Sequence, residues 1–560
     1  MRRLDVLQTD VLVIGAGAAA LRAAIAAHEE NVRVMIVCKG VFPSGCTPRA
    51  MGAMQAVYHP KDSPATHLRD TVIGGRFIND QGLVQQLVNH SREAAEDLER
   101  FGTVFVKEDG KYRLDSFGGY SFPRAILTSE PYAGGFIKGL IRGVRELGID
   151  VVEETMVTRL LNSERLVTGA IGFNVESGSL FTVAAKSTVL ATGGAGSLYS
   201  LTTNPPDVTG DGYVMAYDVA AELIDMEFVQ TRACIVYPAT LKGRPPPADG
   251  LANMGGRFYN AIGERFMKKY DGINIEKVTR DRVAICTHKE ISEGRATAHK
   301  AVYNDLSGVP SEELGRFQSF LKGCKEAGID PTWQPIEWAP GAHYFMGGVR
   351  INESGETNVK GLFCCGEVTG GIHGANRVTA NSLTDALVFG AIAGKSAARH
   401  ALTSSSREIS EKQVQLEKER LFNLYEGKNG IDYIEIRTKL QSVADDYVGV
   451  VRKERDLRKA IDELKRLSEQ VQHSCILGKK NYRELAKLIE TVNLIKVGEM
   501  VARAALERTE SRGAHYREDF PTENNRKWLK NILINLQDDR MTLSTVPSRT
   551  LYVTLPPKEP

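Results

Sequence analysis

The sequence predicts an α/β fold that begins with a nucleotide-binding β-α-β unit. A short β-branched run, 9–14, stops at a glycine-rich turn, and alanine-rich helical sequence follows to about residue 28. A second strand, 32–37, comes at the spacing expected of such a unit. A third apolar strand, 187–191, ends in another glycine-rich turn. Beyond it, the charged stretch 404–514 has helical spacing and indicates a separate helical region.

Length and composition restrict the classes to which this chain can belong. Its 560 residues allow several domains, and 42% hydrophobic with 25% charged residues is typical of a globular protein. No segment approaches the ~18 uncharged apolar residues that a membrane-spanning helix needs. The net charge of +2 provides no long-range attraction to nucleic acid or an acidic membrane. We therefore expect no nucleic-acid partner and no membrane span.

The cysteines indicate that the chain holds no metal centre of its own. None of the eight forms a C-x-x-C pair or the closely spaced run that binds iron–sulfur clusters or zinc. Scattered thiols are typical of a reducing compartment, so we expect a cytoplasmic protein, peripheral to a membrane at most through partner subunits. The apolar stretch 11–27 is compatible with an export signal, but Asp5, Asp10 and Arg22 interrupt this region.

The first glycine-rich turn has the residues expected at a nucleotide pyrophosphate. Its glycines permit a tight turn and a close approach, and the following helix would direct its positive end and backbone N–H groups at the phosphates. The residues assigned to this turn are Gly15, Gly17, Ala18 and Ala19. At the end of the second strand, Cys38 and Lys39 replace the usual ribose-binding acid. A plain tight turn without a ligand is the alternative.

Two further places favour a long dinucleotide over a single phosphate. Thr192, Gly193 and Gly194 follow the third strand, and Asp211 stands in a Thr-Gly-Asp-Gly sequence that opens another helix. Glu367 follows a further short strand, where its carboxylate could accept hydrogen bonds from ribityl hydroxyls. Separated glycine turns of this kind suit a dinucleotide such as FAD.

Seven motifs in order carry a family resemblance. They are Gly15/Gly17, ATGG (191–194), TGDG (209–212), HYFMGG (343–348), GLFCCGE (361–367), HGANR with NSL (373–377 and 381–383) and SRGAHYREDFP (511–521). Together they resemble the flavoprotein family of fumarate reductase and succinate dehydrogenase, with L-aspartate oxidase as a close relative. The resemblance covers nearly the whole chain.

The resemblance implies a Rossmann-like FAD-binding domain that is interrupted by an α+β capping domain and followed by a helical domain. We expect the FAD-binding domain at 1–231 and 343–403, the cap at 232–342, the helical domain at 404–515 and a C-terminal tail at 516–560. The active site would lie where cap and base meet. For the charged helical region we expect a solvated bundle, and a docking face for a partner subunit is the alternative.

By the same resemblance, three residues match the family's catalytic groups. Arg377 and His343 match ligands of the substrate carboxylates, for which a planar, permanently charged guanidinium is well suited. Arg280 matches the arginine that transfers a proton to the substrate. The alternatives are that Arg280 belongs to a surface ion-pair run with its neighbours and that His343 is a core histidine.

The chain also departs from the family pattern. Arg232 stands near the place of a substrate-binding histidine that follows strand 226–230. In the stretch that supplies the family's proton relay, Asp249 can replace the glutamate, but Ala252 cannot replace the arginine. The relay is therefore expected to be truncated, so that either the proton arrives by another route or the substrate is not fumarate or succinate.

The resemblance also predicts flavin contacts in two other segments. The segment 45–50, with Cys46 and Thr47, takes the place where membrane-bound relatives carry a histidine bonded to the flavin. We therefore expect FAD without a histidyl bond, and a thioether to Cys46 is the alternative. Asn381, Ser382 and Leu383 match the family's flavin-binding Asn-Ser-Leu segment.

The function that follows is an FAD-dependent oxidoreductase that moves a hydride between flavin N5 and a small carboxylate, most simply fumarate or succinate. Electrons would be exchanged through a separate iron–sulfur subunit or a reduced carrier. Two alternatives remain: an L-aspartate oxidase, and a flavin electron-transfer subunit of a larger redox complex that lacks carboxylate chemistry.

Overall fold

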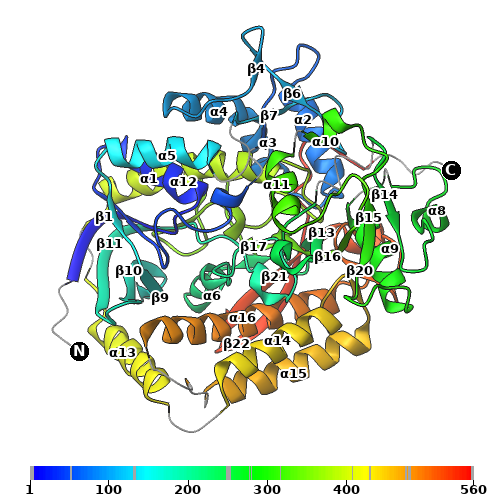
Figure 1. Ribbon diagram of the computed structural model, residues 1–560. Coiled ribbons are helices and arrows are strands. Elements are labelled where there is room, and N and C mark those ends of the chain that lie inside the picture. The colour runs from blue at the N-terminus through cyan, green and yellow to red at the C-terminus, as the bar shows by residue number, and fades with distance from the viewer. Residues whose placement is uncertain are drawn as a thin grey trace.

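The structure is a computed structural model of the chain. It describes all residues except 1–5, 51–52, 130–133, 247–253, 277, 279, 316, 406–407, 428–430, 473–475, 477–480 and 556–560. Figure 1 shows a sheet domain with helices packed on it, a smaller lobe beside it and long C-terminal helices beneath both. Among the helices of the described residues, none has the length and apolar character required to cross a lipid bilayer.

The central sheet contains the predicted β-α-β unit. Its strand order is β8-β2-β1-β11-β10-β9, and β18 pairs with β11. The strands are β1 (Val6–Ile14), β2 (Val34–Val37), β8 (Asp150–Val152), β9 (Thr155–Ser163), β10 (Leu166–Asn174), β11 (Leu180–Leu190) and β18 (Leu362–Cys364). β1 is parallel to both β2 and β11, so the two glycine-rich turns that follow β1 and β11 lie at the same edge of the sheet.

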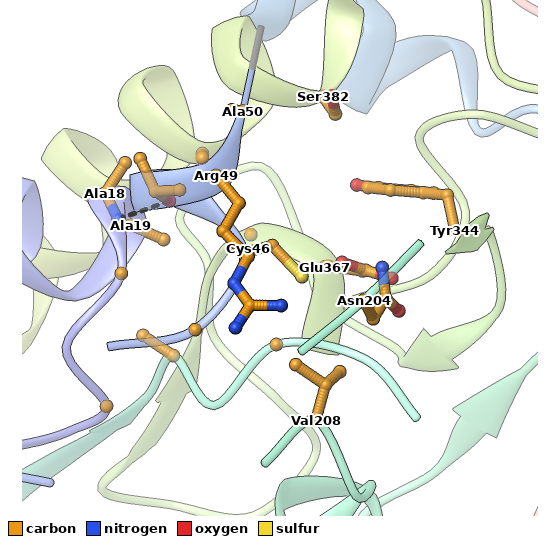
Figure 2. Close-up of a pocket in the computed structure, with 18 of the residues that line it drawn as sticks. Ala18, Ala19, Cys46, Arg49, Ala50, Asn204, Val208, Tyr344, Glu367 and Ser382 are labelled. Atoms are coloured by element: carbon orange, nitrogen blue, oxygen red, sulfur yellow. Dashed lines mark hydrogen bonds between the residues drawn. The ribbon is translucent and has the colours of Figure 1, made fainter. Parts of the chain in front are cut away.

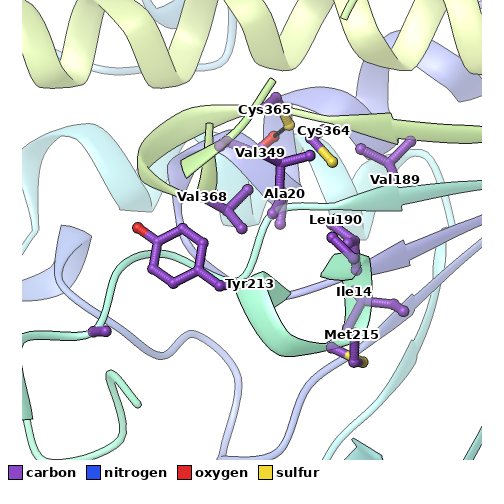
Figure 3. Packing of buried hydrophobic residues seen from close by; sticks show 14 of the residues in the cluster. Ile14, Ala20, Val189, Leu190, Tyr213, Met215, Val349, Cys364, Cys365 and Val368 are labelled. Carbon is purple, nitrogen blue, oxygen red and sulfur yellow. Dashed lines mark hydrogen bonds between the residues drawn. The ribbon is translucent and has the colours of Figure 1, made fainter. Parts of the chain in front are cut away.

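Two long helices cover one face of this sheet. They are α1 (Ala18–His28) and α12 (Asn381–Thr403), which lie side by side in Figure 1. Because α1 is rich in alanine, α12 approaches it closely, and almost every residue of α1 is buried. Figure 3 shows Ile14, Leu190 and Cys364, at the ends of β1, β11 and β18, in the buried core together with Met215 of α6 (Asp211–Asp218).

The cap is connected to the base by a two-stranded antiparallel ribbon. The chain leaves the base on β13 (Val229–Tyr237) and returns on β16 (Ile336–Phe345). The cap sheet has the order β13-β16-β15-β14. Its other main elements are β14 (Arg257–Tyr259), β15 (Val302–Asp305), α8 (Met267–Tyr270), α9 (Arg280–Ser292), α10 (Ser311–Gly315) and α11 (Gln318–Glu326). The expected strand 226–230 thus begins only at residue 229.

The C-terminal region is helical, as the charge pattern predicts. It contains α13 (Glu411–Glu426), α14 (Tyr433–Tyr447), α15 (Glu454–Gln472) and α16 (Tyr482–Glu507). Helix α16 is buried on most of its surface and packs against α6 (Asp211–Asp218) of the base, while α15 keeps a charged face in solvent. The bundle therefore contacts the elements around the nucleotide-binding edge.

The described part of the expected C-terminal tail, residues 516–555, is not a simple tail. They contain a β-hairpin, β21 (Lys530–Gln537) and β22 (Arg540–Pro547), which extends a sheet with β12 (Leu223–Ile224) and β17 (Gly348–Val349). Asp538 and Asp539 both have positive φ, as a two-residue hairpin turn requires. The alternating apolar residues of β21 indicate a strand, so the prediction of a simple tail was wrong for this segment.

Candidate active site

One cavity of about 350 Å³ extends from the glycine-rich turns of the base to the cap. Its lining includes most of the residues that the sequence singled out: Gly15, Gly17, Ala18, Ala19, Cys38, Lys39, Cys46, Thr47, Thr192, Gly193, Asp211, Glu367, Ser382 and Leu383, with Arg232, Arg280, His343 and Arg377. Gly194 and Asn381 lie behind this lining, and Asp249 falls outside the described residues. Figure 2 shows Cys46 and Glu367 pointing into the same space.

The first turn has the shape and polarity for a pyrophosphate. Gly15 has a φ of 132°, and a Cβ at this position would collide with the carbonyl oxygen of Ala191. Helix α1 has no acidic residue in its first turn, and Gly17 at its N-cap provides no side-chain hydrogen bond. The Ala18 N–H donates to Thr47 Oγ1 over 3.1 Å, which brings the segment of Cys46 and Thr47 against the helix end. An anion would find the positive helix end unobstructed by acidic side chains.

Lys39 connects the predicted nucleotide edge to the C-terminal helices. Its Nζ donates to Thr209 Oγ1 at 2.6 Å and to carboxylate oxygens of Asp211 and Glu490, each at 2.7 Å. Asp211 also accepts from Asn493 Nδ2 over 2.8 Å. These two carboxylates raise the pKa of Lys39 above its usual range, so its ammonium stays charged. Its observed role is to hold Asp211 in the cavity wall, with α16 as the support.

Glu367 is a carboxyl group held in an environment that disfavours its charge. It accepts the Phe345 backbone N–H over 3.1 Å, and a Cβ at Gly194 would collide with its Oε1. Burial raises its pKa from an ordinary 4.5 to about 7. Glu367 is therefore a partly buried acceptor or donor next to the space that the cofactor hydroxyls would occupy.

The raised pKa of Glu367 predicts a pH-dependent stability of the flavin-free protein. Below pH 4.5 this carboxyl is protonated in both the folded and the unfolded state, so it does not change the free energy of unfolding. Between pH 4.5 and 7 only the unfolded state ionises it readily, so the free energy of unfolding falls as pH rises, and above pH 7 the loss is complete. Glu367→Gln should therefore become more stable than the wild type as pH rises, by up to about 3 kcal/mol. Urea unfolding at pH 5 and pH 8 measures this, and a difference that does not change with pH would contradict it.

At the other end of the cavity, Arg377 is buried and held on several sides. Its Nη2 donates to Gln230 Oε1 over 2.9 Å, and its Nη1 donates to Ser382 Oγ over 3.3 Å. Its guanidinium carbon lies 4.7 Å from the centre of the Tyr344 ring. Burial, with Arg280 and Arg232 nearby, lowers its pKa from 12.5 to about 10, so it still carries its charge at neutral pH. Its Nε has no hydrogen-bond partner among the described residues.

His343 is neutral and lies beside this arginine. Its Nδ1 shares a hydrogen bond of 2.7 Å with Thr203 Oγ1, and its backbone carbonyl accepts from Asn204 Nδ2 over 3.1 Å. Burial and the charges of Arg377, Arg232 and Arg280 hold its pKa well below the usual range. Because the imidazole lines the cavity, the structure does not favour the core-histidine alternative.

The remaining predicted arginines come from the ribbon and the cap. Arg232 lies on β13, and Arg280 is the first residue of α9. Arg280 faces the cavity, whereas Arg282 is exposed and donates to the Tyr270 carbonyl oxygen over 3.2 Å. The run 280–282 is thus divided between cavity and surface and is not a surface ion-pair run as a whole.

Burial also determines the protonation state of the Cys46 thiol. Its thiol lines the cavity, and burial with the negative charges of Glu367 and Asp207 raises its pKa well above the usual range. Nucleophilic attack requires the thiolate, so this environment keeps Cys46 in its less reactive form.

The sequence did not single out two amides of the site. Gln230 and Asn376 join Arg377 to the cap through side-chain hydrogen bonds of 2.6 to 3.1 Å. Asn376 stands within the HGANR motif directly before Arg377, so the motif contained the signal. No feature of the sequence around Gln230 separates it from an ordinary strand residue.

Comparison with known proteins identifies the family of the chain. Residues 10–383 match the family described as FAD binding domain, and residues 437–560 match fumarate reductase flavoprotein C-term. A fumarate reductase (CoM/CoB) subunit from Methanothermobacter marburgensis is 38% identical over 539 residues, covering 95% of this chain and 98% of that protein. L-aspartate oxidase from Streptomyces coelicolor is 30% identical, covering 95% and 92%.

A solved structure of Escherichia coli quinol fumarate reductase superimposes with a TM-score of 0.91 at 30% identity, covering 99% of both chains. The matches span the base, the cap and the C-terminal region together. The chain is an FAD-binding oxidoreductase of the type that acts on CH–CH groups, and it belongs to the flavoprotein family of fumarate reductase and succinate dehydrogenase.

Proposed function

We propose that this protein reduces a small unsaturated dicarboxylate, most simply fumarate to succinate. The observation that carries the proposal is that Arg232, Arg280, Arg377 and His343 line the same cavity as the glycine-rich FAD turns. A substrate with two carboxylates matches such a cluster of guanidinium groups in charge. The absence of a histidine at position 46 removes the covalent bond that favours succinate oxidation in relatives, so we propose unlinked FAD and the reducing direction.

Arg377 and His343 would bind the substrate carboxylates. The buried Nε of Arg377, which lacks a partner among the described residues, would be satisfied by a carboxylate oxygen. If Thr203 donates its hydroxyl hydrogen to His343 Nδ1, the neutral imidazole carries its hydrogen on Nε2 and can donate it to a second carboxylate. Both groups then bind the substrate without a change of protonation.

Arg280 would deliver the proton. The hydride for one alkene carbon would come from FAD when it is bound. The other carbon needs a proton donor on the cap side, and Arg280 is the cap residue that lines the cavity at the start of a helix. Asp249 remains our proposal for the group that recharges it.

The electron supply and the compartment are part of the same proposal. The Methanothermobacter relative is named as one subunit of its enzyme, which supports a separate iron–sulfur subunit or reduced carrier as electron donor for this chain. All seven cysteines among the described residues are free thiols, which supports a reducing compartment such as the cytoplasm.

Two parallel assays test the function. We expect the purified flavoprotein to oxidise reduced viologen under anaerobic conditions when fumarate is added, and to form one succinate for every two reduced viologens oxidised. Oxygen-dependent peroxide release from L-aspartate, without fumarate reduction, would instead identify an aspartate oxidase. If neither substrate is turned over and neither fumarate nor succinate perturbs the flavin spectrum, the protein is an electron-transfer subunit and the proposal fails.

A further inference from the structure

A chain of side-chain amides connects the base, the ribbon and the cap at the substrate end of the cavity. Gln230 lies near the start of β13, where the chain leaves the base, and its side chain is buried. Its Oε1 accepts from Arg377 Nη2, and its Nε2 donates to Asn376 Oδ1 over 2.6 Å and to the Arg377 carbonyl oxygen over 2.9 Å. The orientation of this amide is determined, because the opposite orientation would place its NH₂ group against the guanidinium.

Asn376 continues this chain into the cap. Its Oδ1 faces Gln230, and its Nδ2 donates to Asp281 Oδ1 over 3.1 Å. Asp281 is the second residue of α9 and directly follows Arg280. The amide of Asn376 also has one satisfactory orientation, because reversal would bring its carbonyl oxygen against the Asp281 carboxylate. Asn376 directly precedes the carboxylate-binding arginine, and its side chain thus contacts Asp281, which directly follows the proposed proton donor.

The base side of this connection is firmly anchored. The Ala375 N–H donates to the Gly75 carbonyl over 2.9 Å, and the Ala375 carbonyl accepts the Ala514 N–H over 2.9 Å. A Cβ at Gly513, which has a φ of 52°, would collide with the same carbonyl. The C-terminal SRGAH segment therefore holds the loop that carries Asn376 and Arg377.

On the cap side, Asp281 accepts the Asn376 amide in the first turn of α9, and Lys289 Nζ, further along this helix, lies 5.6 Å from the centre of the Tyr516 ring. Helix α9 packs on β13, β15 and β16, which are the ribbon and the cap's own sheet (Figure 1). A movement of the cap about the ribbon would therefore carry Arg280 and Asp281 together, relative to a base loop that stays in place. The Asn376–Asp281 hydrogen bond spans that boundary.

We propose that Asn376 is a positioning residue that latches the cap to the base and so sets the separation of Arg280 from Arg377. The catalytic consequence rests on the proposed function, whereas the latch itself does not. When the latch is made, the cap proton donor and the base carboxylate clamp face the same substrate. When it is broken, α9 separates from the base loop and the two arginines no longer act on one molecule.

Exchange of the two polar groups provides a sharp test. Asn376→Asp places a carboxylate against Asp281 and removes the donor, so the latch should open. Asp281→Asn alone keeps an acceptor for the Asn376 amide, so the latch should stay closed. In the double variant, the new amide at position 281 can donate to the new carboxylate at position 376, which still accepts from Gln230, so the latch should close again. Asn535→Ala, a surface amide on β21, is the matched control.

The first measurement is amide hydrogen exchange in α9 of the FAD-loaded protein without substrate. Asn376→Asp should speed exchange in the first turns of α9 by roughly 10-fold, the effect of losing one hydrogen bond to a charged group. The double variant should return to within about 3-fold of the wild type, and Asn535→Ala should not differ from it. Unchanged exchange in Asn376→Asp, or a double variant as fast as the single one, would overturn the latch.

The second measurement is steady-state reduction of fumarate by the same proteins. Asn376→Asp should lower kcat/KM by roughly 10-fold or more and the double variant should recover most of it, with unchanged FAD content throughout. Loss of FAD in the single variant would show a structural role and contradict the proposal. If the wild type reduces no dicarboxylate, the proposed function fails, and the exchange measurement still decides the latch.

Discussion

Replacing Arg377 with alanine should lower kcat/KM for fumarate by at least about 100-fold while FAD remains bound. The guanidinium is buried, and its removal takes away the charge that we assign to a substrate carboxylate. It also leaves Gln230 Oε1 without the donor that it has in the structure. Anaerobic titration of the flavin spectrum with fumarate or succinate measures binding, and reduced-viologen assays measure turnover.

Arg377→Lys is the matched control for charge. A lysine keeps the positive charge but cannot donate to Gln230 and a carboxylate in the same planar arrangement, so its kcat/KM should lie between the wild type and the alanine variant. Thermal unfolding should show that both variants are folded. An alanine variant that binds fumarate as tightly as the wild type would refute our placement of the substrate site.

Gly15→Ala should weaken FAD binding by roughly 100-fold, enough to yield a nearly colourless protein. The added Cβ would collide with the Ala191 carbonyl, so the β1–α1 turn and the β11 turn would move apart. Both turns line the cavity, and a pyrophosphate requires them together. The flavin-to-protein ratio after acid precipitation measures the loss, and complete release of flavin from the wild type by acid would agree with unlinked FAD.

Gly40→Ala is the control for this change. Gly40 follows β2 near the same cavity, and its added Cβ would make only an ordinary contact of 3.5 Å with Ser44 Cβ. Its flavin content should equal that of the wild type, and circular dichroism should show both variants folded. Full flavin content in Gly15→Ala would mean that the turn does not hold the cofactor as proposed.

The hairpin at 530–547 and the turn at Gly15 show two different limits of sequence reasoning. The Gly15 turn is a local feature, because a strand, a glycine and a helix within a short segment determine its shape. The hairpin is also local, with alternating apolar residues and two aspartates at its turn, but its partner strands β12 and β17 are each only 2 residues long. Such short strands leave almost no periodicity from which pairing can be predicted.

Some residues of the site could be predicted from the sequence, whereas the partners of others could not. His343, Arg377 and Arg280 stand in sequence motifs or short recognisable runs, so the family resemblance could assign them to carboxylate chemistry. Lys39 lines the cavity, and its predicted contact with the cofactor stays a prediction; its ammonium pairs with Asp211 and Glu490, which are 172 and 451 residues away in the chain. No pattern around Lys39 indicates those partners.

The sequence by itself determined the α/β class, the nucleotide-binding turns and the chemical types that line the cavity, because backbone conformation and residue chemistry are set within short segments. Only the tertiary structure decided how these types are connected. Gln230 and Asn376 are 146 residues apart, and Asp281 reaches Asn376 only because the ribbon carries α9 back over the base. Such hydrogen bonds depend on the packing of whole elements against one another, and local periodicity contains no record of that packing.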